Sequence, residues 1–354
     1  MTNVATLKQE QQTRMVGNVE MKRVFLKDVF APFVPQNIDT VIEIPVQTTK
    51  HVPRAVEGYI PDVNLLRRAV AWFFSQHRPN FFHTYGPTGS GKTDFWLWFA
   101  ARCNWPVHLV TVTPSLRPDK MQGRWMLKDG ETSYSLGPVA MGMTDGGIVL
   151  LDEADKGSLD FIAKMHLPAE MTKPWSIEDT GETIYPNENF RFITTGNTNG
   201  QGDTNGLYPS SRRWDTAFRN RAYVVPVQYV EPQLEMDIIE GRYPEFRQYR
   251  KTTKSMIKFA NAMRDAMLGP SRKGDIASPL GTAFSTRILL NWCYYIVVAG
   301  INYVPLRETL ETTFMNGIDD KDRDAIEKIA NQVFNGPNGH VLDNPCGWLE
   351  SLGK

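Results

Sequence analysis

The stretch that decides the fold is Gly86-Pro-Thr-Gly-Ser-Gly-Lys-Thr93, which matches G-x-x-x-x-G-K-[ST] at every fixed position. It follows an apolar, strand-like run (NFFHTY) and precedes a helical run (DFWLWFAARC), which is the context that this motif requires. With glycine near 7% of residues, a chance match in a chain this long is about a 1% event. A glycine-rich turn that only caps a helix is the alternative. The motif therefore predicts a loop that binds phosphate groups.

The residue types of this loop suit a nucleotide and a divalent cation. Glycines let backbone N–H groups turn toward phosphate oxygens where a side chain would clash, and the helix N-terminus adds partial positive charge. Lys92 can bridge the β- and γ-phosphates, and Thr93 can place its hydroxyl on Mg²⁺. ATP and Mg²⁺ are the expected ligands. The predicted nucleotide-binding residues of the loop are Gly86, Pro87, Thr88, Gly89, Ser90, Gly91, Lys92 and Thr93.

A second motif, Gly146-Gly-Ile-Val-Leu-Leu-Asp-Glu-Ala-Asp-Lys156, is an apolar strand that ends in carboxylates. The carboxyl ends of strands are where α/β sheets place their ligands. Asp152 is predicted to hold Mg²⁺ together with Thr93, and Glu153 to polarise the attacking water. A strand followed by an acidic helix start is the alternative. For Asp155, a helix N-cap or first-turn acid is the preferred interpretation.

Composition limits the classes of protein that remain. The 354 residues are enough for two compact domains, and 41% apolar with 22% charged residues is typical of a soluble globular protein. A formal net charge of zero argues against a surface that binds nucleic acid throughout, although a local basic stripe stays open. Three scattered cysteines, a polar N-terminus and the absence of a long apolar run predict a cytoplasmic protein without a membrane segment.

The sequence pattern changes twice along the chain, which divides it into three parts. Residues 1–57 form an N-terminal extension broken by prolines. Residues 58–230 alternate apolar strands with helical segments, which predicts a parallel α/β sheet, and residues 231–354 carry helical patterns only. The expected strands are 80–85, 107–113, 147–151, 190–195 and 223–229. The expected helices are 93–103, 158–171, 231–239, 246–267, 286–300, 306–315 and 321–334.

Taken together, these motifs resemble the AAA+ superfamily, and narrower matches point to its MoxR-type branch, with the CobS-like ATPase subunits of cobaltochelatase. The narrower matches are Tyr59-Ile-Pro-Asp62, Asn104-Trp-Pro and Asn197-Thr-Asn-Gly-Gln-Gly-Asp-Thr-Asn-Gly-Leu-Tyr208. The resemblance covers roughly residues 58–300. It implies a three-layer αβα P-loop domain with a parallel sheet, a smaller α-helical lid after it, Mg²⁺-dependent ATP hydrolysis, and assembly into a ring, usually a hexamer.

Three further site residues follow from the resemblance. Asn197 matches the sensor-1 position, which would hydrogen-bond the attacking water or the γ-phosphate. Arg221 matches the arginine finger that contacts the ATP of a neighbouring subunit, but the relatives have Asp-Arg where this chain has Asn220-Arg221, so Arg219 stays a competing candidate. Arg287 matches the sensor-2 arginine of the lid. A turn asparagine and solvated or salt-bridged arginines are the alternatives.

Two stretches predict β-hairpins. Residues 123–134 would turn at Asp129-Gly130, a favoured turn dipeptide, and residues 175–185 precede the sensor strand. In the MoxR-type branch such hairpins face the central channel of the ring, and an ordinary surface hairpin is the alternative. Trp125 would be the first candidate for contact with a client in the channel.

The resulting hypothesis is an ATP-hydrolysing ring that remodels or activates a partner protein. MoxR-type ATPases commonly act with a protein that bears a von Willebrand factor A domain, and the cobaltochelatase ATPase drives metal insertion with two other subunits. A nucleic-acid motor or loader that uses the basic residues of the 246–267 helix is the alternative. A scaffold that binds ATP without hydrolysing it is disfavoured by the intact motif residues. The extension and the altered finger context fit a diverged relative, such as one from a phage or mobile element.

Overall fold

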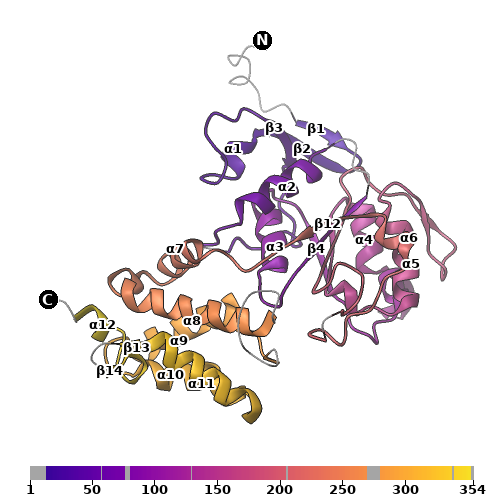
Figure 1. The fold of residues 1–354 in the computed structure, drawn as a ribbon. Helices are drawn as coiled ribbons and strands as arrows, with labels where there is room; N and C mark the ends of the chain where they lie inside the picture. Colours follow the sequence, from indigo (N-terminus) through magenta and orange to yellow (C-terminus); the bar gives the residue numbers. More distant parts are fainter. Residues whose placement is uncertain are drawn as a thin grey trace. The chain divides into compact units, whose positions relative to one another are not determined.

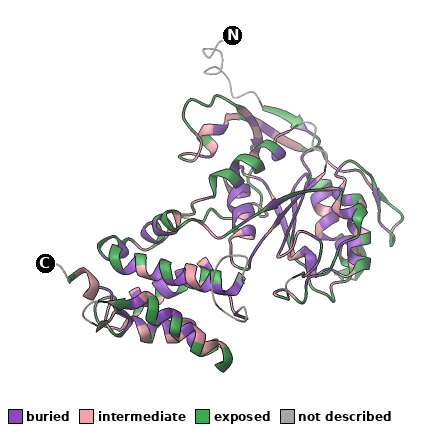
Figure 2. Cartoon of the chain, in the orientation of Figure 1, coloured by how far each residue is buried: buried purple, intermediate pink, exposed green. Residues whose placement is uncertain are grey.

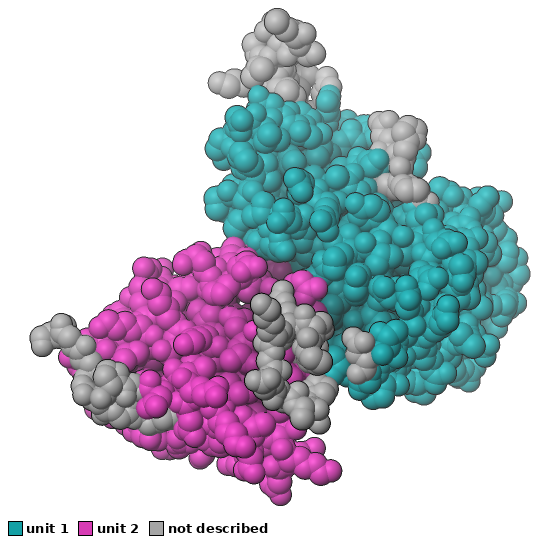
Figure 3. All heavy atoms as spheres, in the orientation of Figure 1, with its two compact units in different colours: residues 1–56, 61–86, 92–227 teal, residues 57–60, 87–91, 228–354 magenta. Residues whose placement is uncertain are grey.

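The computed structural model (Figure 1) describes residues 13–56, 58–75, 80–128, 130–204, 206–268, 280–336 and 339–351. Contacts divide the chain into two compact units, coloured separately in Figure 3. The first unit contains residues 1–56, 61–86 and 92–227, and the second contains residues 57–60, 87–91 and 228–354. By its contacts, most of the phosphate loop thus belongs to the second unit, whereas the strand before it and the helix after it belong to the first.

The first unit is built on a five-stranded sheet in which every neighbouring pair is parallel. Its strands are β4 Phe81–Tyr85, β5 Val107–Thr111, β8 Ile148–Asp152, β11 Arg191–Gly196 and β12 Ala222–Pro226. They lie in the order β12-β4-β11-β8-β5. The three inner strands β4, β11 and β8 are almost entirely buried, as expected for a parallel sheet covered on both faces, whereas the edge strands β5 and β12 are partly exposed (Figure 2). Strand β4, which precedes the phosphate loop, therefore lies beside β11, the strand that ends just before Asn197 and is called the sensor strand below. The sensor strand in turn lies beside β8, which ends in Asp152.

Helices cover both faces of this sheet. Successive residues of a strand point to opposite faces. Phe82 contacts Trp72 and Trp96 on one face, whereas Phe81 contacts Phe218 on the other. These contacts put α2 and α3 on one face and α6 on the opposite one. The helices of this unit are α2 Val63–Phe73, α3 Lys92–Arg102, α4 Pro138–Asp145, α5 Leu159–Ala169 and α6 Thr216–Arg219. The expected three-layer αβα fold with a parallel sheet is confirmed.

The N-terminal residues form a small antiparallel sheet within the first unit. It contains β1 Thr13–Val16, β2 Val19–Phe25 and β3 Val41–Pro45, with the short helix α1 Leu26–Val29 after β2. Phe30 is fully buried and packs on Trp98 and Phe99 of α3. This contact ties the N-terminal sheet to the helix that follows the phosphate loop.

Both expected hairpins are present. Strands β6 Gly123–Lys128 and β7 Glu131–Leu136 pair antiparallel, with Lys128 opposite Glu131, and the predicted turn residue Asp129 lies outside the described residues. Strands β9 Trp175–Ser176 and β10 Thr183–Ile184 form the second hairpin. On β6 the side chains of Trp125, Met126 and Leu127 are all exposed.

The second unit is mainly helical, as expected. Its helices are α7 Pro232–Arg242, α8 Arg250–Leu268, α9 Thr286–Ala299, α10 Leu306–Thr313, α11 Asp320–Phe334 and α12 Trp348–Ser351, with a short strand pair of β13 Asn335–Gly336 and β14 Gly339–His340. Buried aromatic rings of α8, α9 and α11 pack together around Trp292. None of the helices described in the two units is both long and apolar enough to cross a membrane.

Candidate nucleotide-binding site

The lysine and the threonine of the phosphate loop open α3, at the carboxyl end of β4. Lys92 is 8% exposed, and its Nζ donates a hydrogen bond to the carbonyl oxygen of Gly86 at 2.8 Å. The Thr93 hydroxyl donates to Oδ1 of Asp152 at 2.5 Å. Two motifs that are well separated in sequence therefore meet at the ends of two strands, β4 and β8, that flank β11.

Oxygen ligands gather around Asp152. Its Oδ1 also accepts a hydrogen bond from the Thr195 hydroxyl of β11. Carboxylate and hydroxyl oxygens are the donors that Mg²⁺ takes from proteins, which complete its shell with water and phosphate oxygens. Thr93 and Asp152 thus fit the cation predicted for them. Thr195 was not predicted from the sequence. The signal that could have identified it as a site residue is its polar side chain near the carboxyl end of a buried strand.

Glu153 occupies a strained position directly after Asp152. Its backbone is left-handed, with φ 56° and ψ 38°, a conformation that residues other than glycine and asparagine seldom adopt. The Thr195 hydroxyl accepts a hydrogen bond from the Glu153 backbone N–H at 3.1 Å. The Glu153 carboxylate, which is about a third exposed, pairs with Lys156 at 2.6 Å. Strain of this kind is characteristic of residues held in place for function.

The side chain of Asp155 organises the turn after the sensor strand. Asp155 lies in the 3-10 turn Ala154–Lys156 and is fully buried. Its Oδ2 accepts hydrogen bonds from the backbone N–H of Asn197 at 2.9 Å and of Thr198 at 3.0 Å, and from the Ser211 hydroxyl at 2.7 Å. Of the two interpretations of Asp155, the first-turn acid is confirmed by this 3-10 turn, whose N-cap is Glu153, and the contacts of its side chain with the turn after β11 add a role that was not predicted.

A buried histidine lies beneath this turn. His83 of β4 contacts the Thr194 hydroxyl through Nδ1 at 2.8 Å and the Thr198 carbonyl oxygen through Nε2 at 2.9 Å. Since a carbonyl can only accept, Nε2 carries the proton of the neutral ring and Nδ1 accepts from Thr194. Burial lowers the pKa of His83 from 6.5 to about 4, although the Thr198 carbonyl and Asp155 act to raise it. The imidazole is therefore neutral at physiological pH and serves as a fixed hydrogen-bonding bridge.

In the second unit, the phosphate loop packs on the start of α9. Gly89 has φ 72°, and a Cβ at this position would lie 2.4 Å from the Cβ of Ser285, the N-cap of α9. The Tyr229 hydroxyl donates to the Thr88 carbonyl oxygen at 2.8 Å. Close packing at Ser285 thus requires glycine at position 89, and it places the loop against the helix that opens with Thr286 and Arg287.

A buried ion pair supports the same region of the second unit. Arg264 and Glu235 are almost fully buried and form two hydrogen bonds of 2.6 and 2.9 Å. The guanidinium lies over the ring of Tyr229, 4.4 Å from its centre, and the Glu235 carboxylate also accepts from the Thr286 hydroxyl at 2.9 Å. A continuous set of contacts therefore links the Tyr229 that holds the loop to the first turn of α9.

Comparison with known proteins agrees with this geometry. Residues 84–213 match the family described as AAA domain (dynein-related subfamily). The aerobic cobaltochelatase subunit CobS of a Sinorhizobium species is 24% identical over 90% of this chain and 92% of the relative. Protein NorQ of Paracoccus denitrificans is 29% identical over 51% of this chain and 63% of the relative. The denitrification regulatory protein NirQ of Pseudomonas aeruginosa is 31% identical over 38% of this chain and 52% of the relative.

The chain thus contains an AAA domain, and the relatives named CobS, NorQ and NirQ support its resemblance to the CobS-like, MoxR-type branch of AAA+ proteins. The matched region begins in β4 and ends after Ser211, so it contains the phosphate loop, both carboxylates of the acidic strand and Asn197. The CobS-like resemblance drawn from the sequence is thereby confirmed.

The two candidates for the arginine finger of this AAA+ chain differ in their surroundings. Arg221 donates to Oε1 of Glu170 at 2.9 Å and to the Ala217 carbonyl oxygen at 2.8 Å. Arg219, in the last turn of α6, makes no hydrogen bond or ion pair with any side chain in the described part of the chain. Neither arginine contacts Asp152 or Glu153 within the chain, so the finger assignment stays a prediction about a neighbouring subunit.

The sensor-2 candidate of the AAA+ lid, Arg287, lies in the first turn of α9 with its side chain exposed. It directly follows Thr286, whose hydroxyl binds the buried Glu235, and Ser285, whose hydroxyl accepts the Ile288 N–H. Its backbone is thus fixed at the same helix start that packs on Gly89 of the loop. Its contact with a nucleotide stays a prediction.

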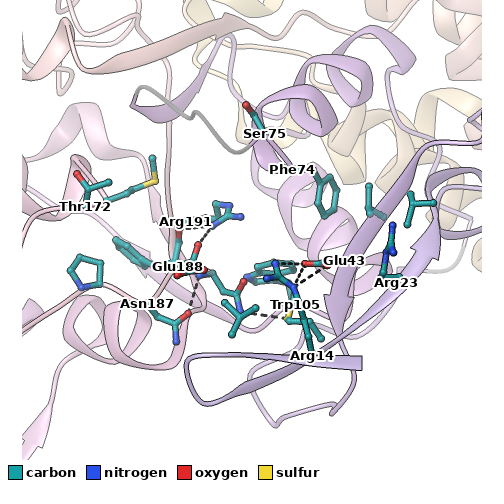
Figure 4. A pocket seen from close by; sticks show the side chains of 18 residues that line it. Arg14, Arg23, Glu43, Phe74, Ser75, Trp105, Thr172, Asn187, Glu188 and Arg191 are labelled. Carbon is teal, nitrogen blue, oxygen red and sulfur yellow. Dashed lines mark hydrogen bonds and ion pairs between the residues drawn. The ribbon is translucent and has the colours of Figure 1, made fainter. Parts of the chain in front are cut away.

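A separate cavity lies at the opposite end of the AAA+ sheet strands. Figure 4 shows it between the N-terminal sheet and the residues that precede β5 and β11. Its volume is about 700 Å³. Arg14 and Glu43 pair across its rim, and Arg191 at its floor is buried against the ring of Trp105. Because this cavity opens at the amino ends of the strands, it is distinct from the phosphate loop and the acidic strand end.

Proposed function

We propose that this AAA+ chain binds ATP with Mg²⁺ and hydrolyses it. The single observation that carries the proposal is the contact of the Thr93 hydroxyl with Asp152 at 2.5 Å, beside the buried Lys92. A glycine-rich turn that only capped a helix would need neither a carboxylate opposite its threonine nor a buried, charged lysine. Lys92, buried beside this contact, would meet the γ-phosphate with its ammonium group.

The reacting groups would come from the ends of three adjacent strands. Lys92 and the loop N–H groups would hold the phosphates, while Thr93 and Asp152 would hold Mg²⁺, which when bound neutralises charge that develops on the phosphate oxygens. Glu153 would orient the attacking water and accept its proton. Asn197 would hydrogen-bond the same water or the γ-phosphate. In the described conformation Glu153 pairs with Lys156, so catalysis would require this carboxylate to turn toward the water.

Assembly would complete the site. AAA+ proteins typically form rings, and we propose a homo-oligomeric ring, of six subunits by family expectation, in which Arg221 reaches the ATP of the neighbouring subunit. An arginine supplied in trans stabilises the transition-state charge. The pairing of Arg221 with Glu170 would hold it ready at the end of α6 and would have to open when the finger engages phosphate. Arg219 remains the competing residue.

The work done by hydrolysis would be remodelling or activation of a partner protein. The exposed Trp125, Met126 and Leu127 on the β6–β7 hairpin provide an apolar surface that a channel-facing hairpin would need to contact a client. We propose a protein with a von Willebrand factor A domain as the partner type. We do not propose for this chain the cobalt chelation that the name of the CobS relative implies. In α8, Arg250 is paired with Glu240, whereas Lys251, Lys254 and Lys258 are exposed, so a nucleic-acid motor or loader stays the alternative function.

The proposal is tested with two variants of the full chain. Lys92→Ala should abolish binding of a fluorescent ATP analogue, because it removes the cation that meets the phosphates. Glu153→Gln should bind ATP normally but hydrolyse it at least about a hundredfold more slowly, the usual scale for loss of a general base. Lys164→Ala, which removes an exposed pair with Glu178, is the matched control and should behave as wild type. Hydrolysis that survives Lys92→Ala would refute the proposal.

A further inference from the structure

The Asp155 carboxylate has an unusual set of partners for a fully buried charge. Four donors converge on its Oδ2: the backbone N–H groups of Asn197 and Thr198, and the hydroxyls of Thr198 and Ser211. Its Oδ1 is buried without a hydrogen bond, and Asp155 forms no ion pair within the described residues. Hydrogen bonds to a charged acceptor are about twice as strong as neutral ones. Four such bonds offset the desolvation of the carboxylate.

The donors come from two different segments. Asn197 and Thr198 form the turn at the end of the sensor strand, whereas Ser211 begins a segment that continues to α6. The backbone of Asp155 adds to the second contact, because its carbonyl oxygen accepts the Arg212 N–H at 2.6 Å. Asp155 thus joins both segments to the turn that begins with the strained Glu153.

The space around the carboxylate is adapted to this role. A Cβ at Gly196 would lie 3.0 Å from Oδ1 of Asp155 and 3.1 Å from Cε1 of His83. A side chain at position 196 would therefore require the carboxylate or the His83 ring to shift by a few tenths of an ångström. His83 holds the Thr198 carbonyl oxygen at 2.9 Å, so the N–H and the carbonyl oxygen of Thr198 are both held by hydrogen bonds.

The segment after Ser211 carries Arg212 and Arg213. Both side chains are exposed, and neither makes a hydrogen bond or ion pair with other described side chains. The same carboxylate therefore fixes the backbone of the sensor asparagine and that of two exposed guanidinium groups. Displacement of reacting or stabilising groups by about 1 Å can lower a rate roughly a hundredfold.

We infer that Asp155 is a positioning residue for hydrolysis. It fixes the positions of Asn197 and of the 211–213 segment relative to Glu153. The inference rests on the proposed ATPase function. Asp155 touches neither nucleotide nor water in this role, and it acts through the backbone of Asn197 and through Ser211. Substitution should thus lower kcat while leaving the ATP-binding contacts of Lys92 and Thr93 in place.

The test compares Asp155→Asn and Ser211→Ala with the wild-type chain. Asp155→Asn keeps the shape but loses the charge, and it leaves a buried amide N–H₂ group without an acceptor. Ser211→Ala removes one donor only. Asp203→Asn is the matched control, because Asp203 accepts the Tyr208 N–H in the same loop and is not a hydrogen-bond partner of Asp155. Backbone amide exchange is measured by mass spectrometry, together with kcat and KM for ATP.

In Asp155→Asn, the amides of Asn197, Thr198 and Arg212 should exchange about tenfold faster, while α3 exchanges as in wild type. kcat should fall roughly ten- to hundredfold with KM changed less than about twofold. Ser211→Ala should show a smaller loss, and Asp203→Asn none. Unchanged exchange at Asn197 and Thr198, or faster exchange with normal kcat, would overturn the inference. The exchange readout needs no ATP, so a wild-type chain that does not hydrolyse ATP refutes the proposed function separately.

Discussion

Two residues near the site, Glu153 and His83, are held by the fold in states that they would seldom adopt in an unfolded, solvated chain. Glu153 keeps a left-handed backbone at the end of β8, and His83 is fully buried as the neutral ring. Each depends on hydroxyls or carbonyls of β11 and of the turn after it, through Thr195 for Glu153 and through Thr194 and Thr198 for His83. The polar residues of β11 therefore act as a scaffold for their neighbours in addition to the role expected of Asn197.

The burial of His83 predicts a loss of stability in acid. Its pKa is about 4 in the folded chain against 6.5 for a free side chain, chiefly because burial disfavours the charged ring. As pH falls from 6.5 to 4, the unfolded chain takes up a proton that the folded chain does not, so the free energy of unfolding falls by on the order of 3 kcal/mol. Below pH 4 this group contributes no further loss.

Urea unfolding of wild type and His83→Gln between pH 4 and 8 measures this effect. The variant should lose stability less steeply than wild type below pH 6.5, and the two slopes should coincide above it. Part of the slope should remain, because burial, reinforced by His51, also lowers the pKa of His108 to about 4. Identical slopes over the whole range would show that His83 titrates as a solvated histidine.

Among the elements, the strands were predictable from the sequence to within one to three residues at most ends, because apolar runs bounded by polar residues mark buried strands. Five of the described α-helices were missed, namely the short α1, α6 and α12 and the longer α2 and α4. Asp62 caps α2 by accepting from the Asn64 and Leu65 N–H groups, a readable signal. Helix α4 is short, with Pro138 at its first turn and Gly146 left-handed at its end, again a readable pattern.

What could not be predicted are the contacts that depend on strand order. The order β12-β4-β11-β8-β5 places β11 between β4 and β8, although β11 follows both in sequence. This order alone brings Thr195 onto Asp152 and the end of β11 onto Asp155. The roles of Lys92, Thr93 and Asp152 were readable from local motifs, whereas Thr195 and the Asp155 side chain required the tertiary structure.

The buried pair between α7 and α8 predicts a large effect of removing one partner. Glu235→Ala would leave the Arg264 guanidinium buried without its carboxylate, which destabilises proteins by about 3–5 kcal/mol. The double variant Glu235→Leu with Arg264→Leu should recover much of that loss, because no unpaired charge remains. Urea unfolding monitored by a signal of the helical unit checks both. If the double variant is no more stable than the single one, unpaired charge is not the cause.

At the scale of the whole molecule, neither Arg219 nor Arg221 contacts Thr93, Asp152 or Glu153 within the described chain. Arg221 is instead held by Glu170, and Arg219 is half-buried in the last turn of α6. A chain with this arrangement should bind ATP alone and hydrolyse it slowly until a second copy supplies the missing cation.

The most direct test is the ATPase rate per subunit as a function of protein concentration, with mass followed by light scattering, for wild type, Arg221→Ala and Arg219→Ala. The rate per wild-type subunit should rise as the ring assembles. Arg221→Ala should assemble normally and lose roughly a thousandfold in rate, and Arg219→Ala should retain most of its activity. A monomer that hydrolyses ATP at the full rate, or an assembled Arg221→Ala ring with wild-type turnover, would contradict a site completed between subunits.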